Sequence, residues 1–157
     1  PQSVFGRFGK ISDTVAGLSS TNGAQALHHA MVLSENSPFD CPVFVGSSTN
    51  AQSIAEYIQE DYQEYNICLC EAGRKGQVAP EDSLGGQLIQ AYLTEDSVQR
   101  DEFLSQMDYL PRTSQIPEHW VSEGDIHHIQ NSRFECIPQV TREDGEIVVF
   151  TDSTSGA

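Results

Sequence analysis

Residues 42–70 read PVFVGSSTNAQSIAEYIQEDYQEYNICLC, and this stretch decides the predicted fold. Residues 42–45 form a short apolar run rich in valine and phenylalanine, which favours a β-strand. Residues 51–65 carry isoleucines and tyrosines at helical spacing, and residues 66–70 are again apolar and predict a second strand. A strand, a helix and a strand in this order predict a parallel pair of strands joined by a right-handed crossover.

Three more helices are predicted outside this unit. Residues 24–33 place apolar side chains at helical spacing, and residues 95–107 predict a polar helix. Pro80 opens another helix, because proline is favoured at the first helical position and two carboxylates follow it. The apolar stripe of that helix comprises Leu84, Leu88, Ala91 and Tyr92.

Two local features refine the predicted helices. Thr49 and Gln52 have the spacing of a capping box at the start of the helix over residues 51–65. Gly85 and Gly86 lie within the helix that begins at Pro80, where each glycine costs about 1 kcal/mol relative to alanine. Such a pair predicts a close approach to another backbone or a local break in the helix.

The remaining elements are short strands and turns. Residues 15–18 and 147–150 are apolar and predict strands, and residues 126–129, with an isoleucine at each end, predict another. Residues 142–145 contain Asp-Gly, a strong hairpin signal. The tail over residues 151–157 is rich in serine, threonine and glycine and is expected to be loose. The pattern predicts a single α/β domain with a mixed, partly parallel sheet.

Composition limits the classes of function. The chain has 157 residues, enough for about one domain, and 8 basic against 23 acidic residues give a net charge of −15. Such a surface would repel nucleic-acid phosphates and anionic lipid, and no apolar run is long enough to span a membrane. Four cysteines do not form a disulfide framework, so we expect a reducing, cytoplasmic setting with Cys68 and Cys70 buried on one strand face.

Three turns are the candidate binding elements. Ligands of open α/β sheets bind beyond the carboxyl ends of parallel strands, where residues 20–23, 46–50 and 72–76 are expected. Free N–H groups at helix starts attract anions, and Arg74 adds a cation on an acidic molecule. Taken singly, these residues also suit an ordinary turn, a helix cap or a solvated loop. Their expected convergence favours a site for a phosphorylated or otherwise anionic small ligand, with a hard metal cation as an option.

The order of these turns resembles that of a known family. Ser20 to Leu27 read STNGAQAL, Val43 to Ser47 read VFVGS, and Ala72 to Gly76 read AGRKG, with an acidic pair downstream. This series resembles the 2-phosphosulfolactate phosphatase (ComB-like) family from about residue 18 to residue 150. The resemblance implies a three-layer α/β/α sandwich and Mg²⁺-dependent hydrolysis of a phosphate monoester on a sulfonated hydroxy acid.

The resemblance also implies roles for individual residues. Thr21, Asn22 and Gly23 would line the phosphate pocket, and Ser47 and Asn50 would border it. Gly73 would keep the third turn close to the substrate, with Arg74 beside it. The catalytic and metal-binding groups implied by position are Glu81 and Asp82.

The chain departs from the family pattern in two respects. The family's first turn reads Thr-Thr-Asn-Gly-Thr-Arg, whereas Ala24 and Gln25 here replace a hydroxyl and a guanidinium. Family members also carry a preceding half with an Asp-x-x-Arg-Ala-Thr element, so we expect a separate N-terminal part or a homo-oligomer partner. The alternative function is a non-catalytic binding or assembly subunit of a larger complex.

Overall fold

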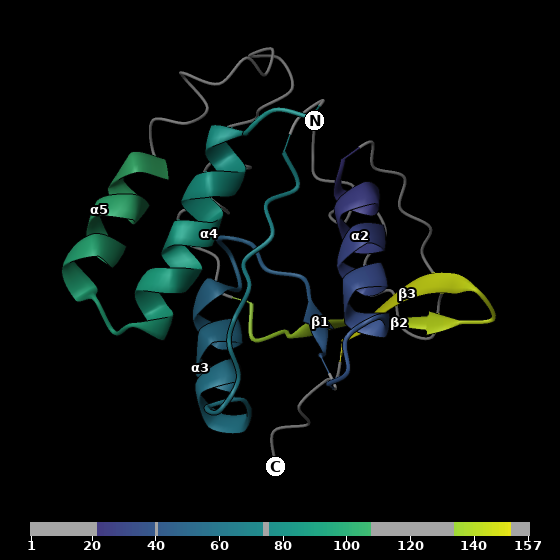
Figure 1. Ribbon diagram of the computed structural model, residues 1–157. Helices are drawn as coiled ribbons and strands as arrows, with labels where there is room; N and C mark the ends of the chain where they lie inside the picture. The colour runs from purple at the N-terminus through teal and green to yellow at the C-terminus, as the bar shows by residue number, and fades with distance from the viewer. Residues whose placement is uncertain (1–21, 40, 74–75, 108–133, 152–157) are drawn as a thin grey trace, which may run out of the picture.

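The computed structural model describes residues 22–39, 41–73, 76–107 and 134–151, shown in colour in Figure 1. These residues form helices and a small sheet in a mixed α and β arrangement. In chain order the elements are α2 (Gly23–Glu35), β1 (Val43–Phe44), α3 (Ala51–Asp61), α4 (Pro80–Leu93), α5 (Ser97–Met107), β2 (Pro138–Glu143) and β3 (Glu146–Thr151). None of the helices described has the length and apolar character needed to cross a membrane.

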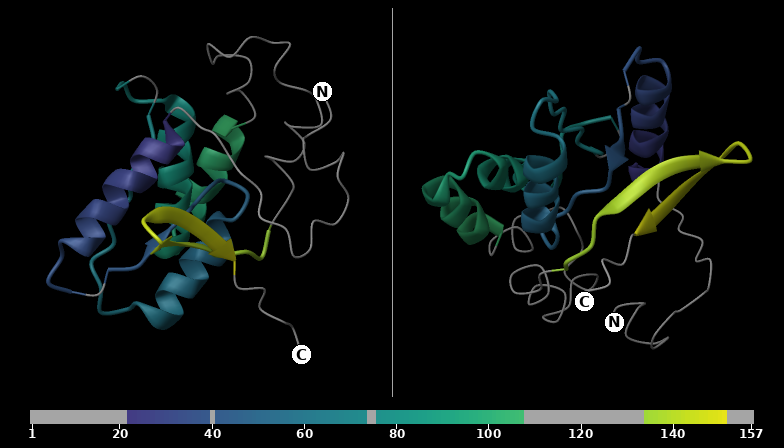
Figure 2. Two further views of the ribbon diagram at one scale, coloured as in Figure 1. Left: turned by 90° about the vertical axis from the view of Figure 1, so that its right-hand side faces the viewer. Right: turned by 90° about the horizontal axis from the view of Figure 1, so that it is seen from below.

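The sheet has the order β1-β2-β3, and both pairings are antiparallel. The β2–β3 hairpin turns at Asp144 and Gly145, whose φ angles are 50° and 85°. Positive φ at both central residues is typical of a type I′ turn, which matches the twist of the strands, so the predicted Asp-Gly hairpin is confirmed. The hairpin runs alongside α2, and its tip projects beyond that helix in the right-hand view of Figure 2.

The expected parallel pair is wrong for the described residues. Residues 66–70 form neither strand nor helix, and β1 instead pairs with β2, with Val43 opposite Val140. Val140 is buried, so β1 pairs with a strand that carries a core residue and lies far along the chain. The sequence around β1 does not reveal this partner. The partly parallel sheet and the three-layer sandwich are therefore not confirmed, and the predicted strands over residues 15–18 and 126–129 lie outside the described residues.

The helix expected over residues 51–65 ends at Asp61. Tyr62 leaves the helix and packs edge-on against Phe44 and Tyr65, with ring centroids 5.7 and 5.3 Å away. These ring contacts hold Tyr62 against β1. The helix therefore ends earlier than the spacing of the tyrosines predicts. The capping box is also wrong, because the first residue outside the helix is Asn50 and its side chain makes no cap bond.

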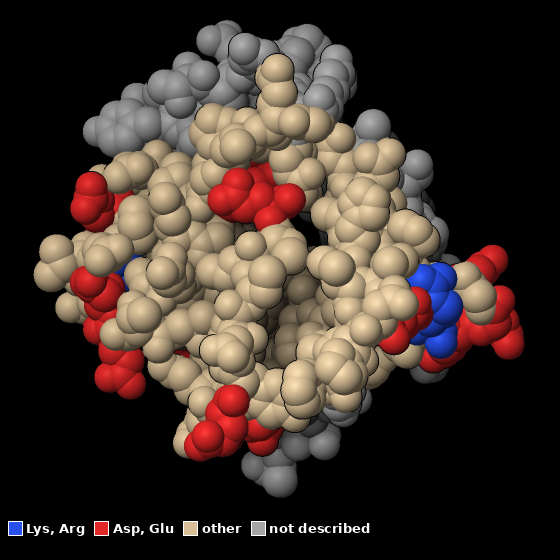
Figure 3. All heavy atoms as spheres, viewed as in Figure 1, with Lys and Arg blue, Asp and Glu red and all other residues tan. Residues whose placement is uncertain are grey.

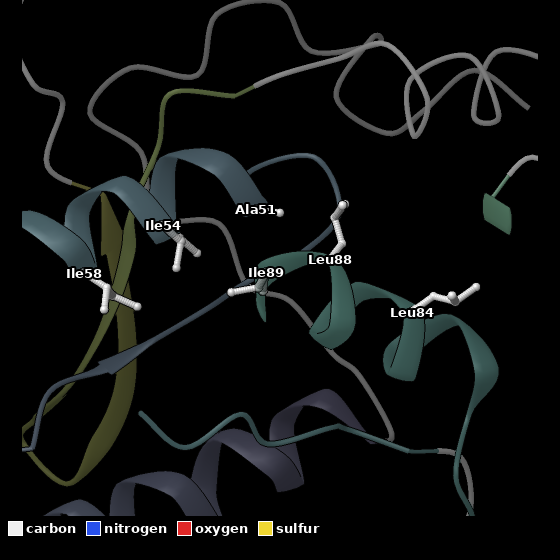
Figure 4. Packing of buried hydrophobic residues seen from close by; sticks show 6 residues of the cluster. All are labelled: Ala51, Ile54, Ile58, Leu84, Leu88 and Ile89. Carbon is white, nitrogen blue, oxygen red and sulfur yellow. The ribbon is translucent and has the colours of Figure 1, made fainter. Parts of the chain in front are cut away.

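The core lies between α3 and α4. Leu88 is fully buried, and α5 covers the cluster with the half-buried Phe103 and Leu104. The predicted stripe on α4 is confirmed for the two leucines and Ala91, whereas Ile89 is a core residue that the prediction omitted. Figure 4 shows the helix from which each member of the cluster projects: Ala51, Ile54, Ile58, Leu84, Leu88 and Ile89.

The glycine pair in α4 does not make the predicted close approach. A Cβ atom built on Gly85 or Gly86 meets nothing within 4 Å, so both positions face open space. Alanine at either position should raise the free energy of unfolding by about 1 kcal/mol, because it restricts the unfolded backbone and favours the helix. Urea unfolding of Gly85→Ala and Gly86→Ala measures this. Gly145→Ala should act in the opposite direction because of its positive φ, and destabilisation by the α4 variants would contradict the open-space interpretation.

Candidate functional site

The turn between β1 and α3 is organised by Asn50, which is only 5% exposed. Its Oδ1 accepts the Ser47 backbone N–H at 2.7 Å and the Ser47 hydroxyl at 2.9 Å. Its Nδ2 donates to the carbonyl oxygens of Val45 and Cys136 at 3.1 and 3.3 Å. Four hydrogen bonds use the whole capacity of a primary amide. A substrate contact by Asn50 would therefore have to replace a bond within the protein.

This turn is also fixed from outside. A Cβ built on Gly46 would lie 2.5 Å from Ile89 Cδ1, so the turn backbone rests on the core side chain of α4. The Phe134 N–H donates to the Thr49 carbonyl at 2.9 Å, and the Ser53 hydroxyl donates to the Phe134 carbonyl at 3.1 Å. Residues just before β2 thus hold the turn by hydrogen bonds, in addition to its contact with α4.

A second cluster joins the turn at Gly73 to the start of α4. The Gly73 N–H donates to Asp82 Oδ2 at 2.8 Å, and the Ser83 hydroxyl donates to Glu71 Oε2 at 2.8 Å. Gly73 has φ +68°, and a built Cβ would lie 2.7 Å from the Gln77 carbonyl oxygen. Glycine is therefore required both by the left-handed backbone and by the close approach.

Carboxylates dominate the electrostatics of this second cluster. Burial raises the pKa of Asp82, the Gly73 hydrogen bond opposes that shift, and the charges of Glu81 and Glu71 raise the pKa further. Perturbed carboxyl groups of this kind are frequent at catalytic sites, where they transfer protons. Figure 3 shows acidic side chains in several groups on the face seen in Figure 1, with a hollow near its centre.

The raised pKa of Asp82 has a measurable consequence for stability. The folded protein holds the Asp82 proton more tightly than the unfolded chain does. The contribution of protonated Asp82 to the free energy of unfolding is therefore lost as pH rises through the raised pKa. Asp82→Asn keeps an oxygen for the Gly73 N–H but cannot ionise. Wild type should therefore lose stability relative to Asp82→Asn as pH rises from about 4, the ordinary aspartate pKa, to the pH at which Asp82 is ionised in the folded protein. Urea unfolding across this range is the measurement, and parallel profiles for the two proteins would count against the prediction.

The first predicted turn is described only in part. Asn22 is the residue before α2, its carbonyl accepts the Ala26 N–H at 3.0 Å, and its side chain makes no cap bond. Thr21 and Arg74 lie outside the described residues. In Figure 1 the helices α2, α3 and α4 run in the same direction, each beginning at its upper end. α2 packs against β1 and β2, whereas α4 packs against α3 and α5.

The described residues do not supply a ligand set for Mg²⁺. No group of three or more His, Cys, Asp or Glu side chains in that part of the chain could hold a metal. Glu81 and Asp82 are neighbours on a helix and point about 100° apart, and Asp82 already accepts a backbone N–H. A cavity of about 420 Å³ lies between α3, α4 and α5, and its lining includes none of the predicted site residues.

The structure thus brings the predicted residues together in two groups. Ser47 and Asn50 share one cluster, and Gly73 and Asp82 share the other. The sequence prediction omitted Glu71 and Ser83, which complete the second cluster. The local signals for them are weak. Glu71 is a carboxylate just before a glycine turn, and Ser83 is a hydroxyl in the first turn of a helix.

Comparison with known proteins identifies one related family. The family model described as 2-phosphosulpholactate phosphatase matches residues 9–136, which include all three candidate turns and both candidate carboxylates. No curated protein and no solved structure gives a significant match to the chain.

Proposed function

Because the chain belongs to the 2-phosphosulpholactate phosphatase family, we propose that it hydrolyses the phosphate monoester of a small sulfonated hydroxy acid. Phosphate would bind at the start of α2, with Thr21, Asn22 and Gly23 around it and Ser47 at the border. In this proposal Gly73 and Arg74 flank the substrate on the third turn. Asp82 would donate the proton that the leaving oxygen requires. Glu81 would assist by helping to keep Asp82 protonated, because its charge raises the pKa of Asp82.

The observation that carries this proposal is a difference between helix starts. α2 and α3 begin without a carboxylate in the first turn, whereas α4 begins with Glu81 and Asp82. Anions are favoured at a helix start and repelled by neighbouring carboxylates. The phosphate therefore belongs with α2 and α3, and the proton-transferring group with α4, where burial raises the pKa of Asp82.

Mg²⁺ enters the proposal from family membership alone. A divalent cation on a phosphoryl group offsets the charge that develops on its oxygens. Two adjacent carboxylates are not a complete ligand set, so no step of the reaction is assigned to the metal.

Release of inorganic phosphate from 2-phosphosulfolactate tests the proposal. Purified protein should release phosphate with Mg²⁺, release less with excess EDTA, and act poorly on the analogue without the sulfonate. Asp82→Asn should lower kcat by about 100-fold, because general acid–base catalysis contributes at least that much. The protein should remain folded, since asparagine keeps an acceptor for the Gly73 N–H.

The matched control is Asp96→Asn. Asp96 is also an aspartate at a helix start, where its Oδ1 accepts the Gln99 N–H at 3.0 Å. Asp96 directly precedes α5, away from the start of α4, and its replacement should leave kcat unchanged within about two-fold. Failure of wild type to release phosphate from either substrate would refute the proposed function, and equal losses in the two variants would refute the role of Asp82.

A further inference from the structure

Cys68 and Cys70 lie in the segment that connects α3 to the turn at Gly73. Their Sγ atoms are 3.7 Å apart, and both residues are exposed. The sequence prediction of buried core cysteines is wrong, because both are exposed and residues 66–70 are not part of the sheet formed by the described residues. Because the two thiols are accessible and in contact, their placement is not explained by packing in the core.

We propose that Cys68 and Cys70 form a redox-active dithiol, which closes reversibly to a disulfide by exchange with a small-molecule disulfide such as oxidised glutathione. One cysteine thiolate attacks a sulfur of the oxidant, whose S–S bond breaks, and one glutathione thiolate leaves. The second cysteine then attacks the mixed disulfide, and a second glutathione thiolate leaves. The two protein protons pass to the leaving thiolates, so two protein thiols are oxidised and one disulfide is reduced to two thiols.

The backbone geometry allows this ring to close. An extended chain advances about 3.3 Å per residue, which places Cα atoms two residues apart at about 6.6 Å. Disulfides span Cα separations of roughly 4.4–6.8 Å, so a small contraction brings the sulfurs from contact to bonding distance. Residues 66–70 belong to neither a helix nor a strand, so no ladder of backbone hydrogen bonds resists this contraction.

The other two cysteines provide a contrast. Cys41 is half-buried and its thiol donates to the Ser37 hydroxyl at 3.2 Å, and Cys136 is also half-buried. Partial burial and the adjacent Cys68 sulfur raise the pKa of Cys70, which lowers the share of Cys70 present as the attacking thiolate. Because Cys68 and Cys70 are exposed and in contact with each other, exchange should select them over the half-buried Cys41 and Cys136.

The test uses the full chain carrying Cys41→Ser and Cys136→Ser, in which Cys68 and Cys70 are the only thiols. The reduced protein is incubated with oxidised glutathione, quenched with N-ethylmaleimide and measured by intact mass and by non-reducing electrophoresis. The expected product is a monomer that carries neither maleimide nor glutathione, and dithiothreitol should restore two reactive thiols. Wild type, mapped by peptide mass, should show the same Cys68–Cys70 link.

Matched variants separate ring closure from simple accessibility. Adding Cys68→Ser or Cys70→Ser leaves one thiol, which should stop at the glutathione mixed disulfide. Two glutathione adducts on the parent variant, covalent dimers, or resistance of both cysteines to oxidation would each overturn the proposal. Because wild type is mapped in parallel, an unfolded variant does not prevent the decision.

Discussion

Leu88→Ala is expected to lower the free energy of unfolding by about 3–4 kcal/mol. Leu88 is 0% exposed and lies in the cluster between α3 and α4, so truncation removes buried methyl groups and leaves a cavity. Neighbouring side chains from α3, α4 and α5 hold the walls of that cavity apart, which limits its collapse. Urea unfolding followed by circular dichroism at constant pH is the measurement.

Leu33→Ala is the matched control for this change. Leu33 has the same chemistry and also lies in a helix, α2, but it is 68% exposed. Its loss should change the free energy of unfolding by less than about 0.5 kcal/mol. Similar costs at Leu33 and Leu88 would contradict the assignment of the core to the interface between α3 and α4.

The helices were predictable because their information is local. Pro80 with carboxylates after it marks the start of α4, and the spacing of Leu84 and Leu88 marks its buried face. The Asp144–Gly145 turn was predictable for the same reason, because its residue types suit positive φ. Propensity, capping and spacing each act over a few residues and can be read from a short stretch of sequence.

The sheet was not predictable because its information is distant. Val43 pairs with Val140, and the apolar residues at 66–70 give no sign that their segment stays outside the sheet. The same limit applies to the second cluster. Gly73 and Asp82 were singled out from the sequence, but the hydrogen bond between them depends on how the chain returns to α4. Sequence reasoning identified turn residues without showing which of them contact each other.

Asn50→Ala is expected to lower the free energy of unfolding by about 3 kcal/mol. Alanine removes four hydrogen bonds at a position that is 5% exposed and leaves the Ser47 N–H and the carbonyls of Val45 and Cys136 without this partner. Asn50→Asp keeps an acceptor for Ser47 but directs a carboxylate oxygen at the two carbonyls. We expect it to be destabilised at least as much at neutral pH.

The matched control for Asn50 is Asn36→Ala. Asn36 donates from Nδ2 to the Val32 carbonyl at 2.7 Å, but it is exposed at the end of α2, so water can replace the bond and the cost should stay below about 1 kcal/mol.

Phosphate release by Asn50→Ala, measured beside its unfolding curve, separates two roles of Asn50. If Asn50 positions Ser47, activity and stability fall together, because the N–H that borders the proposed phosphate site loses its anchor. Lost activity at unchanged stability would instead make Asn50 a direct substrate ligand, and a cost no larger than that of Asn36→Ala would remove it from the architecture of the turn.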